Sequence, residues 1–488
     1  MGKKIPMWQC LLVIAVMLAL LIWEIVVADD EEGHIALILA GTFAAVVAVL
    51  NGWKWSYLEQ GILAAINRSM QAMLILAVVG LMLGSWVAGG VVPSMMFYGI
   101  KIIAPSIFLF TACLLCSIVS LATGSSWSTA GSMGVALIGV GTALGFNPAM
   151  TAGAVVSGAY FGDKMSPLSD TTNLAPAVAG SNLFDHVKHM IWTTGPSLAI
   201  ALVVYLVLGL RQSGAADADL EIVDSILMFI TDNFKVGLIY LIPPVFVIAA
   251  VALKLPALPS LIGGVLLGLP FMAMQGVDPK TWMNILNYGS AVEAPADPVL
   301  SELAGLLSSS GMQGMMWTIS LIMCAMVFGG IVDCTGMMAT LAGALLKMVR
   351  GTGGLVAITI FSCIFVNIVC CDQYLAIILP GRMYKEAFED RRLKAKNLSR
   401  CLEDSGTITS NFIPWNTCGA TMTSFLGQPQ WGPGGYAPYA ILNWLNPLVS
   451  IFYGFTGISM EKMSEEEYQK LLEAREEEKA AALKALEA

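Results

Sequence analysis

The feature that most constrains this chain is a series of apolar runs, each long enough to cross a lipid bilayer. The runs 11–27, 35–50 and 70–92 reach or approach the roughly 18 to 20 residues that span a membrane. Only 12% of the 488 residues are charged, against about 25% in soluble domains. Because several such runs recur, a single secretory signal peptide does not explain them. The sequence therefore predicts an all-α polytopic membrane protein.

The chain also divides into two similar halves. The segments 69–73 and 311–315 each open a long apolar run, and Met70 and Met312 lie 242 residues apart. Further on, 117–131 aligns without a gap with 367–381, at an offset of 250. Two matched landmarks in the same order indicate duplication. We expect a first repeat over 1–210, a polar linker over 211–233, a second repeat over 234–459 and a charged helical tail over 460–488.

The number of spans predicts how the halves are related. Five spans in each half, an odd number, would place the two repeats in opposite orientations, so we expect them to be inverted. Between the third and fourth span of each half, the apolar regions 105–145 and 354–383 are interrupted by polar residues, which predicts two re-entrant hairpins. The predicted spans are 7–27, 34–51, 70–92, 148–176 and 191–210, followed by 234–252, 256–274, 313–335, 400–425 and 435–459.

Basic residues predict the orientation in the membrane. Lys347 and Arg350 precede the second hairpin and seven Lys or Arg residues follow it over 382–400, a pattern typical of cytoplasmic loops. The first hairpin has only Lys101 before it and no Lys or Arg over 102–161, as expected if it opens outward. With Lys3 and Lys4 before the first span, we expect both termini in the cytoplasm and a location in the cytoplasmic (inner) membrane.

The two predicted hairpin tips, 123–129 and 370–374, are polar. Broken backbone at membrane depth is tolerated only where it is buried in protein or lines an aqueous cavity, and its oxygens are ready ligands for a hard cation. The alternative is a Ser/Thr-rich surface for helix packing. The candidate ligands at the tips are Ser125, Ser126 and Asp372.

The fourth span of each half is interrupted as well, over 158–173 and 403–417, by Gly, Pro, hydroxyl and carboxylate residues. A carboxylate at mid-membrane costs about 2.5 to 3.5 kcal/mol, so four of them cost on the order of 10 kcal/mol if all are deep, which favours a function. The structural alternatives are that Asp163 pairs with Lys164 or Lys188 and that Asp404 lies in a wet cytoplasmic loop. The candidate site residues are Asp163, Asp170, Thr171, Ser125, Ser126, Asp372, Asp404, Asn416 and Thr417.

The strings 123–131, 158–173 and 403–419 resemble the signature regions of the NhaC-type sodium/proton antiporters, and the landmarks follow in the same order over 7–459. That family is similar to the wider ion transporter superfamily, whose members have two hairpins and two broken helices around a central site. The resemblance implies a homodimer and an elevator-like movement of the hairpins and broken spans, with the spans over 7–51 and 234–274 in the scaffold. Relatives carry Ser-Asn-Thr at the hairpin tips, where this chain has 125–127 and 372–374.

Electrostatics predicts how such a site exchanges cations. A carboxylate desolvated in a bilayer binds a proton more tightly, whereas a bound sodium ion favours its charged form, so the two cations compete for one site. We therefore expect exchange of sodium for protons by alternating access. The predicted sodium ligands are Asp170, Asp372, Ser125, Ser126, Thr171 and Asn416.

Other functions have less support from the sequence. Some similar proteins exchange small carboxylates such as malate and lactate with sodium and protons. Only Lys164, and Arg382 beyond the second hairpin, offer positive charge to such an anion, although helix N-termini in the hairpins could hold a carboxylate without a full charge. A channel or scaffold would not need duplicated broken spans. The chain has no P-loop, Rossmann fingerprint or zinc-protease motif, so we expect a transporter and not an enzyme. Its expected partners are small cations and the lipid membrane. We expect neither a cofactor nor nucleic acid.

Overall fold

The computed structural model describes residues 2–24, 33–102, 104–167, 169–213, 220–253, 255–346, 351–473 and 475. These residues fold into helices, with isolated β-bridges as the only strand-type pairing among them. Within these ranges, five helices are long and apolar enough to cross a membrane, or up to seven if each of two bent pairs counts as one span. The prediction of an all-helical protein with several apolar helices is confirmed.

The helices of the first half run from α1 to α10. Their bounds are α1 Met7–Ile22, α2 His34–Leu50, α3 Trp55–Ala88, α4 Val91–Ile102, α5 Phe108–Thr123, α6 Ser126–Thr129, α7 Val135–Ala143, α8 Pro148–Met165, α9 Asp170–Ala179 and α10 Leu183–Ser213. A π-helical turn, Ala130–Gly134, joins α6 to α7.

The second half continues from α11 to α23. Its bounds are α11 Leu220–Asn233, α12 Ile242–Ala252, α13 Ala257–Gln275, α14 Trp282–Tyr288, α15 Pro298–Leu306, α16 Gly311–Gly314, α17 Met316–Cys334, α18 Met337–Leu346, α19 Gly351–Cys370, α20 Gln373–Glu389, α21 Ala395–Leu402, α22 Thr417–Leu426 and α23 Ile441–Thr456.

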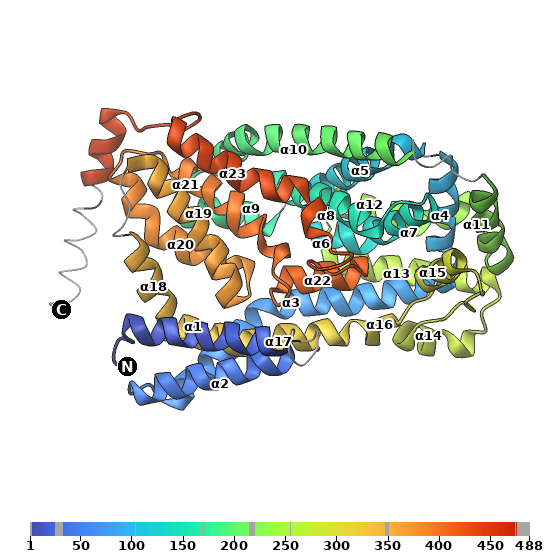
Figure 1. Ribbon diagram of the computed structural model, residues 1–488, viewed down its shortest axis with the longest axis horizontal. Coiled ribbons are helices and arrows are strands. Elements are labelled where there is room, and N and C mark those ends of the chain that lie inside the picture. Colours follow the sequence, from blue (N-terminus) through green and yellow to red (C-terminus); the bar gives the residue numbers. More distant parts are fainter. Residues whose placement is uncertain are drawn as a thin grey trace.

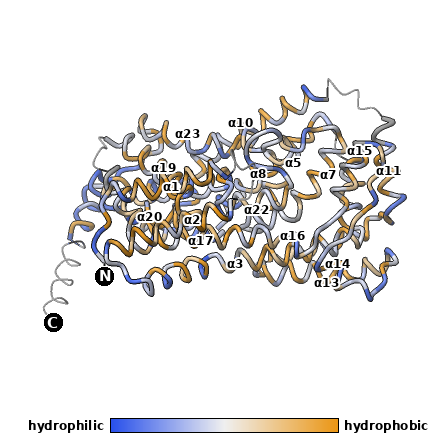
Figure 2. Tube along the Cα trace, turned by 60° about the horizontal axis from the view of Figure 1, so that its bottom comes forward, coloured by the Kyte–Doolittle hydropathy of each residue, from blue (hydrophilic) through white to orange (hydrophobic). Residues whose placement is uncertain are grey.

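The long helices α3, α10 and α17 run along the longest axis of the molecule (Figure 1). The N-terminus and α20 lie at one end of this axis, and α11, α14 and α15 lie at the other, in both views (Figures 1 and 2). Figure 2 shows hydrophobic residues along the helices and hydrophilic residues near the N-terminus and near α14. This distribution suits a protein whose long axis crosses a bilayer.

Local sequence explains why helices break where they do. Gly124 ends α5 with a φ of 69°, and Ser125 then begins α6 with its side chain accepting the Ser128 N–H. Between α19 and α20, Cys371 has a φ of 58°, which is strained for a residue with a side chain, and Asp372 caps α20. Both interruptions fall within the predicted tips.

The two predicted broken spans are interrupted too. The break between α8 and α9 contains Pro167, whose ring prevents the helix from continuing through it. In the second half, α21 passes into a π-helical turn, Glu403–Thr407, then a short 3-10 helix and Pro414, before α22 begins at Thr417. Turns of the π type are frequent at functional sites.

Some predicted boundaries differ from the structure. The third span was predicted to begin at residue 70, but α3 begins at Trp55. Polar residues before position 70 interrupt the apolar run, so the hydropathy pattern did not indicate the earlier start. One of them, Arg68, forms an ion pair of 3.1 Å with Asp333 of α17. Much of the predicted linker is helical as α11, while 214–219 lie outside the described residues.

The charged tail is helical over 465–473, and Ser464 and Glu467 form a capping box at its start. Residues 474 and 476–488 of the tail, and the predicted flanking charges Lys347 and Arg350, lie outside the described residues.

Candidate functional site

The first predicted tip and the break between α8 and α9 meet at a buried carboxylate. Ser126, at the start of α6, donates a hydrogen bond of 2.6 Å to Oδ2 of Asp163, in the last turn of α8. Ser169, in the break between α8 and α9, donates a second bond of 2.6 Å to Oδ1. Asp163 is only 6% exposed, and Thr171 lies 3.1 Å from the Ser169 hydroxyl. Two hydroxyls from separate segments thus bind this acid, and a third hydroxyl lies beside one of them.

Glycine allows these segments to come close. Gly158 and Gly162 lie on the face of α8 that packs against α5, and a side chain there would collide with the backbone of Cys113 and Leu121. Helices in membranes commonly use small residues for such close packing. The position of the hairpin tip relative to Asp163 therefore depends on this contact.

The second predicted tip and the break before α22 also lie together. Asp372 is 2% exposed, and its Oδ1 accepts the Leu375 N–H at 2.9 Å. The Thr417 N–H donates to the Cys371 carbonyl at 3.0 Å, which joins the two breaks. Asn416 caps α22 by accepting the Cys418 N–H at its Oδ1. Its Nδ2 donates a hydrogen bond of 3.2 Å to Oδ1 of Asn367 in α19. Asn416 and Thr417 thus hold the backbone of this region in place.

Three of the predicted acids lie on elements that contact one another. Asp372 caps α20, Asp170 begins α9, and Asp163 is in the last turn of α8. Helix α20 packs against α9, and α9 packs against α8. Asp170 itself is exposed, at the first position of α9. Of these three acids, Asp163 and Asp372 are the buried ones.

A second buried charged group lies beside Asp163. The ammonium of Lys164 is paired with Oδ1 of Asp404, and neither side chain has any exposed surface. Thr193 and Asn446 each donate a hydrogen bond of 2.9 Å to the same oxygen. The guanidinium of Arg400 lies 3.8 Å from Oδ2. A buried carboxylate is tolerated when it is paired and hydrogen-bonded in this way.

This arrangement corrects both structural alternatives from the sequence. Lys164 pairs with Asp404 and not with Asp163, while Lys188 is exposed. Asp404 is fully buried and not in a wet loop. The reason is that Lys164 follows Asp163 directly, and adjacent residues on a helix point in different directions.

The sequence did not single out four residues that contact these acids, nor one buried acid beside them. The four are Ser169, Thr193, Arg400 and Asn446, and the acid is Glu403. Glu403 is fully buried, and neither of its carboxylate oxygens has a hydrogen-bond partner within the described part of the chain. Ser169 and Glu403 lie inside the polar strings that drew attention to Asp163 and Asp404, so proximity in sequence could have identified them. Thr193 and Asn446 stand in apolar helices, where nothing distinguishes them from packing residues.

The segment from α8 to α23, which carries these acids, has recognisable relatives. A family model described as the Na+/H+ antiporter family matches residues 158–458. The chain belongs to this family. The resemblance seen in the sequence is confirmed, and this member is a multi-pass membrane transporter rather than an enzyme.

Individual relatives cover nearly the whole chain of this family member. It is 38% identical over 464 residues to the Na(+)/H(+) antiporter NhaC of Alkalihalophilus pseudofirmus, a match that covers 95% of this chain and 98% of the relative. It is 35% identical over 431 residues to the Na(+)/H(+) antiporter NhaC of Bacillus subtilis, covering 87% and 92%. It is also 32% identical over 452 residues to the malate-2H(+)/Na(+)-lactate antiporter of Bacillus subtilis, covering 92% and 95%.

Proposed function

We propose that this protein exchanges Na+ for H+ across the cytoplasmic membrane, and that Asp163 is the carboxylate for which the two cations compete. The observation that carries this proposal is the environment of Asp163: it is 6% exposed, and both of its oxygens accept hydroxyl hydrogen bonds of 2.6 Å, from Ser126 and Ser169. Carboxylate and hydroxyl oxygens are the ligands that hard cations prefer. Relatives named as Na(+)/H(+) antiporters support the same substrates.

The chemistry of these groups suits exchange. A serine hydroxyl has one hydrogen to donate and two lone pairs, so Ser126 and Ser169 can orient the Asp163 carboxylate and still offer oxygen to a cation. With Na+ bound, the carboxylate carries the charge that balances the ion. With a proton bound, the carboxyl group is neutral and has no charge with which to hold Na+. Because one group takes one cation at a time, movement of the loaded site between the two sides gives antiport.

The favoured ligand set differs from the one that the sequence predicts. Asp163 replaces Asp170, because Asp163 is buried among hydroxyls whereas Asp170 is exposed. We keep Asp372 as the second carboxylate, since it is buried and caps α20, which packs against α9, the helix that Ser169 begins. Thr171 stays in the set through its contact with Ser169.

The remaining predicted ligands act mainly as helix caps in this proposal. Ser125 accepts the Ser128 N–H at 3.1 Å, and Asn416 accepts the Cys418 N–H at 3.0 Å. Each of these side-chain oxygens therefore has one lone pair engaged by the backbone. Their role would be to hold the hairpin tip and the break in position around the carboxylates.

We further propose that the two halves are inverted repeats that move by alternating access. The residues that cap the helices after the four breaks support a duplication. Ser125 caps α6 and Asp372 caps α20, and these two residues lie 247 residues apart. Ser169 precedes α9 and Asn416 caps α22, and they also lie 247 residues apart. One spacing shared by both pairs is expected if each half contributes one hairpin and one broken helix.

Exchange of small carboxylates is the second candidate, because one relative is named as a malate-2H(+)/Na(+)-lactate antiporter. An anionic substrate requires a positive partner in the site. Lys164 is already paired with Asp404, and Arg382 is exposed beyond the second hairpin tip. The charges that are available therefore favour a cation as the substrate.

The decisive experiment uses proteoliposomes with an imposed pH gradient. We expect Na+ alone to dissipate the gradient, and Asp163→Asn to abolish this exchange. Asp278→Asn is a matched control, because Asp278 is an exposed carboxylate that caps a short helix and asparagine caps equally well. If dissipation requires malate or lactate, the cation-exchange proposal is wrong. If Asp163→Asn retains full exchange, the site assignment is wrong.

A further inference from the structure

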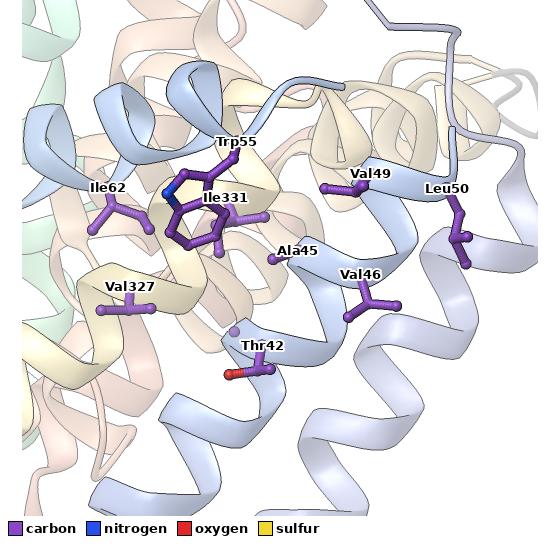
Figure 3. A pocket seen from close by; sticks show the side chains of 10 residues that line it. Thr42, Ala45, Val46, Val49, Leu50, Trp55, Ile62, Val327 and Ile331 are labelled. Atoms are coloured by element: carbon purple, nitrogen blue, oxygen red, sulfur yellow. The ribbon is translucent and has the colours of Figure 1, made fainter. Parts of the chain in front are cut away.

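An apolar groove lies between helices α2, α3 and α17, and Figure 3 shows the side chains that line it. Helices α2 and α3 each pack along α17 but scarcely touch one another, which leaves a groove of about 310 Å³ between them. Val46 and Leu50 of α2, Trp55 and Ile62 of α3 and Val327 of α17 line it. The Thr42 hydroxyl in the groove donates to the Ile38 carbonyl at 2.9 Å, so its hydrogen is already used within α2.

The groove is open to the surroundings of the protein. Its lining on α2 extends from residue 41 to residue 50, about 13 Å along a helix. Val46 is 50% exposed, Leu50 81% and Trp55 57%. Large apolar side chains with this much exposure on a membrane protein face the hydrocarbon chains of lipids.

The mouth of the groove carries positive charge. Lys54 directly precedes Trp55, and the N-terminal segment is fastened over the turn between α2 and α3, where Lys3 N–H donates to Asn51 O at 2.9 Å and Trp53 Nε1 donates to Lys3 O at 3.2 Å. Lys3, Lys4 and Lys54 are all exposed. The nearby acid on α3 is Glu59, also exposed, so the lysines outnumber it by three to one.

Aromatic side chains show where the lipid headgroups lie. Trp53 and Tyr57 pack together with ring centroids 5.2 Å apart, beside Trp55. Trp and Tyr gather at the membrane–water interface, where their rings sit at the level of the headgroups. The lysines are therefore at headgroup depth, and the groove leads from them toward the hydrocarbon.

We infer that this groove binds one anionic phospholipid, with an acyl chain between α2 and α3 and its phosphate beside Lys3, Lys4 and Lys54. Basic clusters at the ends of membrane helices attract anionic headgroups in this way. A second copy of the chain fits less well, because a two-fold contact over the groove would bring the same surface, with its three lysines, against itself. The inference does not depend on which cation is transported.

The test measures phospholipid retained by the purified full-length protein, using native mass spectrometry. The probes are phosphatidylglycerol and phosphatidylcholine with identical acyl chains. We expect the wild type to retain phosphatidylglycerol at least several-fold better than phosphatidylcholine. Equal retention of the two lipids would overturn the inference.

Two variants separate the headgroup from the chain. The preference for phosphatidylglycerol should disappear in the triple variant Lys3→Gln/Lys4→Gln/Lys54→Gln. The control replaces three lysines near the opposite end of the molecule with glutamine, Lys101, Lys235 and Lys280, and should keep the preference. Val46→Trp should fill the groove from its exposed rim and reduce retention of phosphatidylglycerol about tenfold, with helical content unchanged by circular dichroism. Unchanged retention of phosphatidylglycerol in the Val46→Trp variant would overturn the inference, whether or not that variant forms dimers. An unchanged preference for phosphatidylglycerol in the triple lysine variant would overturn it too.

Discussion

The buried pair of Lys164 and Asp404 gives the sharpest test of the structure. We predict that Lys164→Met and Asp404→Asn each destabilise the protein strongly, and that the double variant recovers much of the loss. Both side chains are completely buried and joined directly to one another. Removing one partner of such a pair leaves an uncompensated charge in the interior, which typically costs about 3 to 5 kcal/mol.

The surroundings of Asp404 refine this magnitude. After Lys164→Met, the carboxylate keeps its hydrogen bonds from Thr193 and Asn446 and the charge of Arg400 at 3.8 Å, so we expect a loss near the lower limit, about 3 kcal/mol. In the double variant, the asparagine oxygen can still accept both hydrogen bonds, the Lys164 charge is gone, and Arg400 loses its carboxylate but keeps its hydrogen bonds to Ser459. The coupling energy between the two substitutions should therefore be about 2 to 3 kcal/mol.

The assay is reversible unfolding in mixed micelles, with helix content followed by circular dichroism as the denaturing detergent is increased. Wild type, both single variants and the double variant complete the cycle. If the two single losses add to within about 0.5 kcal/mol of the double variant, the side chains do not interact and the described pairing is wrong. Transport by the double variant can be measured separately, because the stability argument makes no use of it.

Three further outcomes follow from single side chains. Asp372→Asn should abolish exchange without loss of stability, since asparagine still caps α20, whereas Asp372→Ala should also destabilise by about 1 kcal/mol in the same micelle assay. Gly162→Ala should cost about 1 to 3 kcal/mol and weaken Na+ affinity in transport assays, because the new methyl group meets the backbone of Leu121 and moves the hairpin away from α8. The Ser464 backbone N–H donates to Glu467 and holds the pKa of Glu467 below its ordinary value of 4.5. Protection of the tail from proteolysis should therefore persist above pH 4.5 and decrease as the pH falls below it. Glu467→Gln should remove this pH dependence.

Each of these outcomes can fail separately. Exchange that survives in Asp372→Asn would remove this acid from the proposed site. A Gly162→Ala variant with unchanged stability would mean that α5 and α8 are farther apart than described. Tail protection that stays constant through acidic pH would show that the capping box does not control docking of the tail.

The sequence alone determined the class of the protein and the places where its helices break. Apolar runs, and Gly or Pro beside polar residues, are local signals, and they identified the tips at 123–129 and 370–374 and the interruptions near Asp163 and Asp404. Local signals suffice here because a helix ends for reasons within a few residues of its end. The family resemblance came from these same strings.

Only the tertiary structure decided which of these polar residues meet. Asp163 and Asp170 are equivalent in a sequence pattern, yet one is buried beneath Ser126 and the other is exposed, because the break at Pro167 redirects the chain between them. Lys164 finds its partner 240 residues away, in the other half of the molecule. Such pairings depend on the rotation and register with which whole helices pack against one another. The sequence near each residue does not determine either.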